Sequence, residues 1–331
     1  MLLNATRPTD PRPSPVTREH GLLEALVGDG GPALSLTAVA LFLSGAFAVF
    51  LAARREFLPH DVAYLQMTAE QLCGLADCRI VHFMFHDRVA FGGTLIAVAI
   101  LYFWLIAFPL REGLLWAWWT LVVTGTLGFG SFLLYLGYGY LDSWHGAGTA
   151  ALLPVFVLGL WVSRRHATRV DIAWMRRGER QAIPALVRRG RCGILATGAG
   201  LTLAGAVIMY LGTTEVFVSE DIAFMGLSRE AINAISDRLI PLIAHDRSGF
   251  GGGLTTVGVL LLLCGWHAPP SRAFHQAILA AGTAGFGFAI GTHFAEGYLN
   301  PVHLAPAILG AGLFLVSVLS ERAGWRRRAA M

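Results

Sequence analysis

The sequence carries the same charged motif at two distant places. Residues 81–93 read VHFMFHDRVAFGG and residues 239–253 read LIPLIAHDRSGFGGG, so a histidine, an aspartate and an arginine precede a glycine-rich apolar run in both. The two copies supply His86, Asp87, Arg88, His245, Asp246 and Arg247. Neutral imidazoles beside carboxylates bind zinc, copper or iron in proteins, so these residues are candidates for a metal or redox-cofactor site.

Other ionisable side chains accompany the two motifs. They are Asp61, His82, Asp142 and His145 in the first half of the chain, and Asp221, Glu296 and His303 in the second. We expect one divalent-metal site per half, the first from His86, His145 and Asp61 and the second from His245, His303 and Asp221. His82 is a weaker candidate, because Pro241 stands at its position in the second copy. Haem held by two histidines is less favoured, since these histidines are expected near the membrane surface.

A structural role explains part of the motif equally well. Asp87 and Asp246 could cap the N-termini of membrane helices that begin there, while Arg88 and Arg247 reach the lipid headgroups. Only the histidines, which both copies retain, would then need a functional explanation.

His293 and Glu296 form a separate candidate pair. They are three residues apart and can share a helical face, whereas their aligned positions in the first half are Leu136 and Gly139. A proton relay, a ligand acid and a simple hydrogen-bonded pair all fit this spacing.

The composition indicates an integral membrane protein. Of the 331 residues, 55% are hydrophobic and 14% are charged, with a mean hydropathy of +0.59, whereas soluble domains average about 25% charged residues. All 25 basic residues are arginine. The sequence has no P-loop, dinucleotide fingerprint or nucleophile elbow, and no soluble basic face, so we expect neither nucleotide chemistry nor nucleic-acid binding.

Eight apolar runs are long enough to cross about 30 Å of hydrocarbon. They lie near residues 33–53, 89–110, 113–138, 147–163, 193–213, 249–266, 273–295 and 303–320. The expected fold is therefore all-α, a polytopic membrane protein with about eight transmembrane helices.

Several strings recur in the same order in the two halves and predict two tandem four-helix repeats. FLPHDVAYLQMTAEQL (57–72) matches FVSEDIAFMGLSREAI (217–232), GTLGFG (125–130) matches GTAGFG (282–287), and GYLDSWH (139–145) matches GYLNPVH (297–303). Four spans in each copy make this a parallel repeat with a pseudo-two-fold axis along the membrane normal. The predicted segments are a disordered arm (1–32), a first unit (33–163), a basic linker (164–192), a second unit (193–320) and a basic tail (321–331).

The arginines predict the orientation. Residues 164–191 hold nine of them and the tail after residue 320 holds four. Cytoplasmic loops are enriched in basic residues, so both termini are expected in the cytoplasm and the two charged motifs at the outer face. The linker is expected to rest on anionic lipid headgroups. Whether the protein forms a homo-oligomer or joins a membrane complex stays open.

The segment between the first two spans of each half is too patterned for a plain loop. Thr68 and Gln71 predict a capping box and Ser228 is the matching cap, so each segment should contain a short helix. Cys73 and Cys78 lie on the side expected to be oxidising and are candidates for a disulfide. Cys192 and Cys264 are expected to be free.

One part of the second half supports a resemblance. PLIAHDRSGFGG (241–252), with FVSEDIAFMGL (217–227) before it and VHLAPA (302–307) after it, resembles a group of bacterial multi-pass membrane proteins that has no established activity. The resemblance covers most of the second half and, through the repeat, the first. It implies a location in the bacterial inner membrane and supplies no site residues.

Three functions follow from these expectations. The first is an outward-facing site that binds a metal ion or a small polar ligand, for redox or hydrolytic chemistry, through the motif histidines and aspartates with His145 and His303. The second is a small-molecule transporter whose two units rock about the axis, although the inner halves of the spans hold little charge. The third is a structural or assembly subunit of a membrane complex.

Overall fold

The computed structural model of the chain describes residues 28–75, 77–133, 140–177 and 183–329. Most of the expected N-terminal arm, the last residues of the third expected span and residues 178–182 of the expected linker lie outside this part of the chain. Two residues at the end of the expected tail, 330 and 331, lie outside it as well.

The described chain is built from helices and contains no β-strand. In order they are α2 (Gly31–Ala53), α3 (Pro59–Leu65), α4 (Ala69–Leu75), α5 (Arg79–Leu105), the π-helical turn η1 (Ile106–Leu110), α6 (Leu115–Leu133), α7 (Ser143–Ser163), α8 (Trp174–Arg177), α9 (Ala185–Gly212), α10 (Ser219–Met225), α11 (Arg229–Ile235), α12 (Leu239–His267), α13 (Arg272–Ala295) and α14 (Pro301–Ala329).

Seven of the described helices are long and apolar enough to cross a membrane. They are α2, α5 with η1, α7, α9, α12, α13 and α14. The all-helical, polytopic class predicted from the sequence is therefore confirmed. An eighth expected span coincides with α6, whose described residues are not among the seven, so the count of eight stays a prediction.

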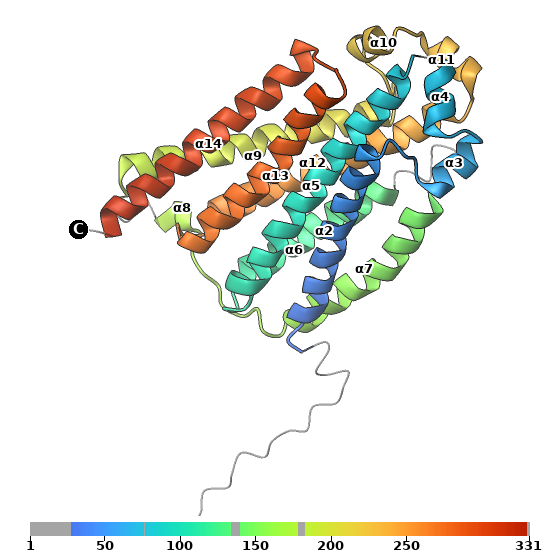
Figure 1. The fold of residues 1–331 in the computed structure, drawn as a ribbon. Helices are drawn as coiled ribbons and strands as arrows, with labels where there is room; N and C mark the ends of the chain where they lie inside the picture. The colour runs from blue at the N-terminus through green and yellow to red at the C-terminus, as the bar shows by residue number, and fades with distance from the viewer. Residues whose placement is uncertain (1–27, 76, 134–139, 178–182, 330–331) are drawn as a thin grey trace, which may run out of the picture.

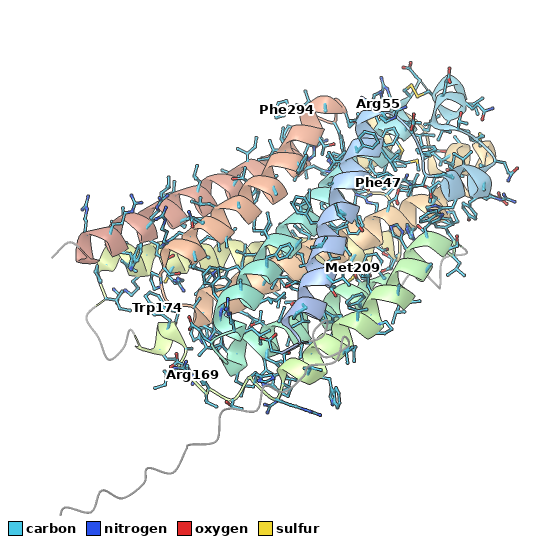
Figure 2. All side chains as sticks on the ribbon, turned by 60° about the horizontal axis from the view of Figure 1, so that its bottom comes forward. Phe47, Arg55, Arg169, Trp174, Met209 and Phe294 are labelled. Carbon is cyan, nitrogen blue, oxygen red and sulfur yellow. A yellow bond between two sulfur atoms is a disulfide. The ribbon has the colours of Figure 1, made fainter. Side chains whose placement is uncertain are left out.

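Helices α5 and α12 form the centre of the bundle, and the other long helices surround them (Figure 1). Helix α5 packs against α2, α13 and α12, and α12 packs against α9, α6 and α5. The outer helices expose large apolar side chains such as Phe47 and Phe294, which Figure 2 shows on the surface of the bundle. Exposed apolar surface of this extent is typical of helices that face lipid.

The order of elements is similar in the two halves of the chain. A long helix is followed by two short ones and three long ones, first from α2 to α7 and then from α9 to α14. The packing pairs match as well, because α2 contacts α5 as α9 contacts α12, and α5 contacts α13 as α12 contacts α6. Whether these halves form a tandem repeat stays a prediction.

Glycines allow two of these helix pairs to approach closely. A Cβ atom on Gly205 of α9 would lie 2.4 Å from the backbone nitrogen of Thr255 and 2.6 Å from the carbonyl oxygen of Gly251 on α12. In the first half, a Cβ on Gly45 of α2 would lie 2.5 Å from the carbonyl oxygen of Gly92 on α5. Small residues at such crossings allow the van der Waals contact between backbones that holds helices together in lipid.

The two central helices begin earlier than the apolar pattern predicts. Helix α5 begins at Arg79 and α12 at Leu239, whereas the expected spans begin at residues 89 and 249. The sequence pattern fails here because the charged motifs resemble a helix end, yet they lie inside both helices.

The short helices α3, α4, α10 and α11 lie together at one end of the bundle (Figure 1). The predicted capping box of α4 is confirmed: Thr68 N donates to Gln71 Oε1 at 2.8 Å and Gln71 N donates to Thr68 Oγ1 at 3.2 Å. Ser228 caps α11 by accepting from Ala231 N at 3.2 Å. Between α4 and α5, Cys73 and Cys78 form a disulfide, and Cys192 and Cys264 are free.

The opposite end of the bundle is held by a buried arginine. Arg191 of α9 has no solvent exposure; its Nε donates to Glu321 Oε1 of α14 at 2.8 Å, and its Nη1 donates to the carbonyl oxygen of Ala268 at 2.7 Å. Its guanidinium also lies 4.2 Å from the ring of Trp174. The expectation that the linker arginines face lipid headgroups is therefore wrong for Arg191, because helix α9 begins inside the predicted linker. It stays a prediction for the others.

Substitution of Gly205 by alanine should separate α9 from α12. An added methyl group clashes with backbone atoms that do not move independently, so we expect a loss of about 1–3 kcal/mol in the free energy of unfolding. Gly200→Ala is the matched control on the same helix, because nothing lies within 4 Å of a Cβ there. Thermal unfolding in detergent measures both. Equal midpoints for the two variants would contradict the close crossing.

Candidate functional site

The predicted site residues lie at the end of the bundle that carries the short helices. Asp61 lies on α3, Asp221 on α10, and the two charged motifs lie on α5 and α12. Asp142 immediately precedes α7, and Glu296 follows α13. The fold therefore brings together residues from six different parts of the chain.

Arg88 forms two ion pairs, one within the first half and one with the second half. Its Nη1 donates to Oδ2 of Asp61, and its Nε donates to Oδ2 of Asp246, both at 2.7 Å. The Arg88 side chain is 14% exposed and Asp61 is 2% exposed. Charges in a membrane are costly unless they are paired, so these three groups stabilise one another.

Arg247 repeats this arrangement in the second half. Its Nη1 donates to Oδ2 of Asp221, and its Nε lies 3.6 Å from Oδ2 of Asp87. Each arginine thus pairs with the aspartate of the short helix that precedes its own long helix. Each also pairs with the motif aspartate of the other central helix. The two sets of ion pairs are reciprocal.

The capping interpretation of the charged motif is wrong. Helix α5 begins at Arg79 after the N-cap residue Cys78, and α12 begins at Leu239 after Arg238. Asp87 and Asp246 lie inside these helices, where no orphan amide needs a cap. Their arginine neighbours are held in the ion pairs described above and do not extend to headgroups.

Two tyrosines that the sequence analysis did not select complete the ion pairs. Tyr140 donates its hydroxyl proton to Oδ1 of Asp61, and Tyr298 donates to Oδ1 of Asp221, both at 2.6 Å. Both residues stand in the repeated GYL strings, which was the available signal. Burial raises the pKa of Tyr140, and the neighbouring Asp61 carboxylate raises it further, so this side chain is a hydrogen-bond donor at neutral pH.

Arg88 and Tyr140 keep Asp61 ionised. Burial of the Asp61 carboxyl acts to raise its pKa, but the charge of Arg88 and the hydrogen bond from Tyr140 lower the pKa by more. The net pKa is below the usual value of an aspartate, so Asp61 is a carboxylate at neutral pH.

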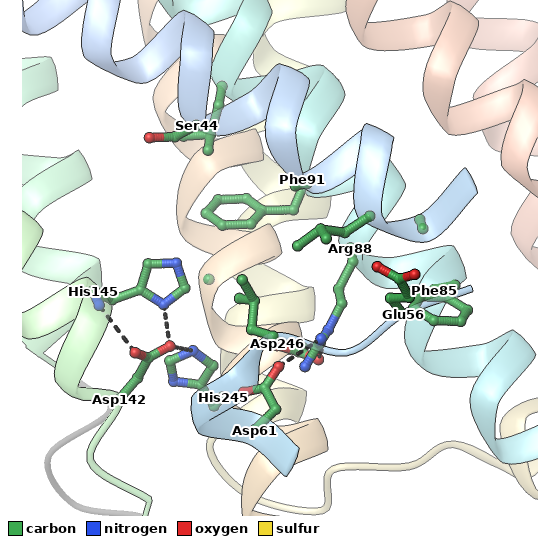
Figure 3. A pocket seen from close by; sticks show the side chains of 16 residues that line it. Ser44, Glu56, Asp61, Phe85, Arg88, Phe91, Asp142, His145, His245 and Asp246 are labelled. Atoms are coloured by element: carbon green, nitrogen blue, oxygen red, sulfur yellow. Dashed lines mark hydrogen bonds and ion pairs between the residues drawn. The ribbon is translucent and has the colours of Figure 1, made fainter. Parts of the chain in front are cut away.

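Asp142 lies at the centre of a cluster of three histidines. His145 Nδ1 contacts its Oδ2, His245 Nε2 lies 3.5 Å from the same oxygen, and His60 Nε2 lies 3.1 Å from Oδ1. Asp142 is also the N-cap of α7 and accepts from Trp144 N at 2.9 Å, which fixes the position of the carboxylate. Figure 3 shows His145, His245 and Asp142 converging beside the Arg88 ion pairs.

Asp142 is ionised despite its burial. Desolvation acts to raise its pKa, but hydrogen bonds with the rings of His145 and His245 lower the pKa by more, and the net value is below the usual range. A buried carboxylate that faces imidazole nitrogens is a suitable ligand for a divalent cation.

This cluster borders a cavity of about 70 Å³. His145, His245 and Asp142 form part of its polar side, next to Arg88 and Asp246. The apolar side comes from α2 and α5 through Ala48, Leu51, Ala52, Phe91 and Leu95. One water molecule needs about 10–15 Å³ of such space, so the cavity admits several waters or a small group.

Two groups of side chains in the described chain have ligand atoms close enough to share a metal ion. Asp142, His145 and His245 form the first group, and His60, Asp61 and Asp142 form the second, with all ligand atoms of a group within 4.8 Å of one another. Zinc bonds of about 2.0–2.1 Å place tetrahedral ligand atoms about 3.3 Å apart. The 3.5 Å between His245 Nε2 and Asp142 Oδ2 is close to this value.

The corresponding histidines of the second half form a hydrogen-bonded chain. His293 Nδ1 lies 2.7 Å from the carbonyl oxygen of Tyr298, which can only accept, so we assign the proton to Nδ1 and a lone pair to Nε2. His86 Nε2 lies 3.2 Å from this nitrogen and donates to it. His86 Nδ1 lies 3.1 Å from Oδ1 of Asp87. Both ring nitrogens of His86 thus have polar partners, and neither group of metal-ligand atoms found in the described chain includes His86.

His303 and Glu296 lie apart from the Asp142 cluster. His303 corresponds to His145, but Asn300 stands in place of Asp142 and accepts from Val302 N at 2.8 Å. Glu296 Oε2 lies 2.6 Å from Nδ1 of His82 and also accepts from Arg55. His82 is therefore paired with an acid, and neither group of metal-ligand atoms found in the described chain includes it.

The expected division into one ligand set per half is wrong. His245 of the second half joins Asp142 and His145 of the first, while His86 of the first half joins His293 and Tyr298 of the second. The central helices α5 and α12 cross between the halves, so each presents its motif histidine to the other half. His60 had no signal beyond the different residue, Glu220, at its matched position.

Comparison with known proteins does not assign the chain to a family. No family model, curated protein or solved structure matches the chain. The resemblance to bacterial multi-pass membrane proteins stays a prediction, and the functional argument depends on the geometry of the Asp142 cluster.

Removal of Arg88 should destabilise the whole bundle. Arg88→Ala leaves Asp61 and Asp246 buried without a counter-charge, so we expect a loss of about 3–5 kcal/mol in the free energy of unfolding. The measurement is thermal or denaturant unfolding of the purified protein in detergent.

Arg54→Ala is the control for this experiment. Arg54 pairs with Glu56 at 2.8 Å on the exposed surface, where ion pairs contribute little to stability, and no measurable change is expected. Comparable losses in the two variants would contradict the central role of the Arg88 pairs.

Proposed function

We propose that this protein is a membrane-embedded metalloprotein that binds a divalent transition-metal ion on Asp142, His145 and His245 and uses it to activate water. The observation that carries this proposal is the convergence of two imidazoles on a buried carboxylate beside a small cavity. Three protein ligands and an open position are the pattern of catalytic zinc sites. An ion held by these three residues would lie beside the cavity, which is large enough for water to complete its coordination.

The donor set narrows the choice of metal. Two histidines and one carboxylate occur in hydrolytic zinc sites and also in non-haem iron(II) sites. Bound zinc lowers the pKa of its water to about 7, which supplies hydroxide at neutral pH. Hydrolysis is therefore the favoured chemistry, and iron in the purified protein would favour a redox reaction instead.

The proposal includes the finer architecture. Two tandem four-helix units with α6 as an eighth span are supported by the matching order of elements and by the reciprocal pairs of Arg88 and Arg247. The arginine-rich segments lie at the end away from the short helices, which supports N-in and C-in termini in a bacterial inner membrane, an outward-facing site and linker contacts with anionic headgroups.

The ion pairs also bear on the transporter alternative. Rocking of the two units would separate Arg88 from Asp246 and Arg247 from Asp87, which leaves charges unpaired inside the bundle. A rigid site between the halves is more consistent with these contacts than a moving one.

Metal titration of the purified full-length protein tests the proposal. Wild type should bind Zn²⁺, or Co²⁺ with the visible absorption of a tetrahedral site. The double variant His145→Ala/His245→Ala should bind the same ion more than about 100-fold more weakly, because loss of direct ligands costs more than loss of their supporting contacts. Isothermal titration calorimetry gives the dissociation constants.

His303→Ala is the matched control, because His303 stands at the position of His145 in the second half but lies beside Asn300. Its affinity should equal that of wild type. Metal-free wild type, or undiminished binding by the double variant, would overturn the proposal and favour the transporter or the assembly subunit.

A further inference from the structure

Asp142 presents its two oxygens to two different sets of ligands. Oδ2 faces His145 and His245, the site described above. Oδ1 faces the other way, toward His60, whose Nε2 lies 3.1 Å from it. A carboxylate with ligands on both oxygens has the geometry of a bridge between two metal ions.

The side chains near Oδ1 of Asp142 supply the ligand atoms for a second metal site. His60 Nε2 lies 3.5 Å from Oδ1 of Asp61, and these atoms and Asp142 lie within 4.8 Å of one another. Asp61 Oδ1 accepts from Tyr140, but a carboxylate oxygen has two lone pairs and can bind an ion as well. The His60 side chain is only 11% exposed, and its Nε2 faces the two carboxylate oxygens. An imidazole nitrogen that faces two buried carboxylates is in position to share a cation with them.

The local charge is consistent with more than one cation. Asp61, Asp142 and Asp246 bring three negative charges, and Arg88 is the one guanidinium among them. With neutral histidines these groups carry a net charge of −2. One divalent ion would balance this charge, and a second would be partly balanced by a hydroxide ligand that the ions generate from water.

We propose that a second divalent metal ion binds between His60 Nε2, Asp61 Oδ1 and Asp142 Oδ1, so that Asp142 bridges a dinuclear centre. This inference depends on the proposed function, because the first ion occupies the Asp142, His145 and His245 site. Paired ions about 3.5–4 Å apart stabilise both the attacking and the leaving oxygen in a displacement reaction.

The second half of the chain lacks this centre and serves as an internal comparison. Glu220 stands at the position of His60, and Asn300 stands at that of Asp142. An amide bears no charge and does not bridge metal ions as a carboxylate does. The dinuclear centre is therefore specific to the first half and to His245.

Metal counting distinguishes one ion from two. Full-length wild type in detergent, saturated with Co²⁺ and freed of excess ion, should hold about two ions per chain by mass spectrometry. His60→Ala should hold about one and keep the absorption of the first site. Asp142→Asn should lose both, because the shared carboxylate is gone. Glu220→Ala is the control and should keep about two.

Electron paramagnetic resonance of wild type gives an independent readout that needs no variant. Two Co²⁺ ions joined by one carboxylate interact magnetically, so the signal of the half-loaded protein should change in shape as the second equivalent binds. His60→Gln should abolish this change, and circular dichroism verifies that the variant is folded.

The outcomes separate the two proposals. About one ion in both wild type and His60→Ala, without magnetic interaction, would overturn the second site and leave the proposed function intact. Two ions that persist in both His60 variants would also overturn it. No bound ion in wild type would overturn both.

Discussion

Two arginines inside the membrane-embedded bundle make its polar end stable. Arg88 and Arg247 each hold one aspartate from a short helix and one from the opposite central helix. A carboxylate placed between helices without such a partner would be costly, because neither lipid nor apolar side chains solvate it. The charged motifs therefore determine how α5 and α12 cross, and the glycine contacts allow α2 and α9 to pack closely against them.

The same crossing gives the two clusters different chemistry. In the first, Asp142 lies among imidazoles whose nitrogens face its oxygens. In the second, Asn300 replaces the acid, and His86 and His293 satisfy each other by hydrogen bonds. Similar frameworks of arginine, aspartate and tyrosine thus hold one cluster with donors suited to metal ions and one in which two imidazoles contact each other.

The sequence predicted the membrane class and the short helices well, because apolar length and the Thr68 capping box are local signals. It did not predict that the charged motifs lie inside α5 and α12. A polar stretch in an apolar run resembles a helix end unless its partners are known, and the partner of Arg88 on α12 is 158 residues away. The exchange of His86 and His245 between halves depends on the same long-range crossing, which no spacing within one half reveals.

The position of His245 in the chain has a consequence for biogenesis. Chains are synthesised and inserted from the N-terminus, so the candidate spans α2, α5 and α7 enter the membrane before α12 exists. At that stage Asp142 and His145 are present without His245, and Asp87 is present without Arg247. Asp87 and Asp142 therefore lack these contacts in the first half of the chain, and the centre around Asp142 is completed only when α12 inserts.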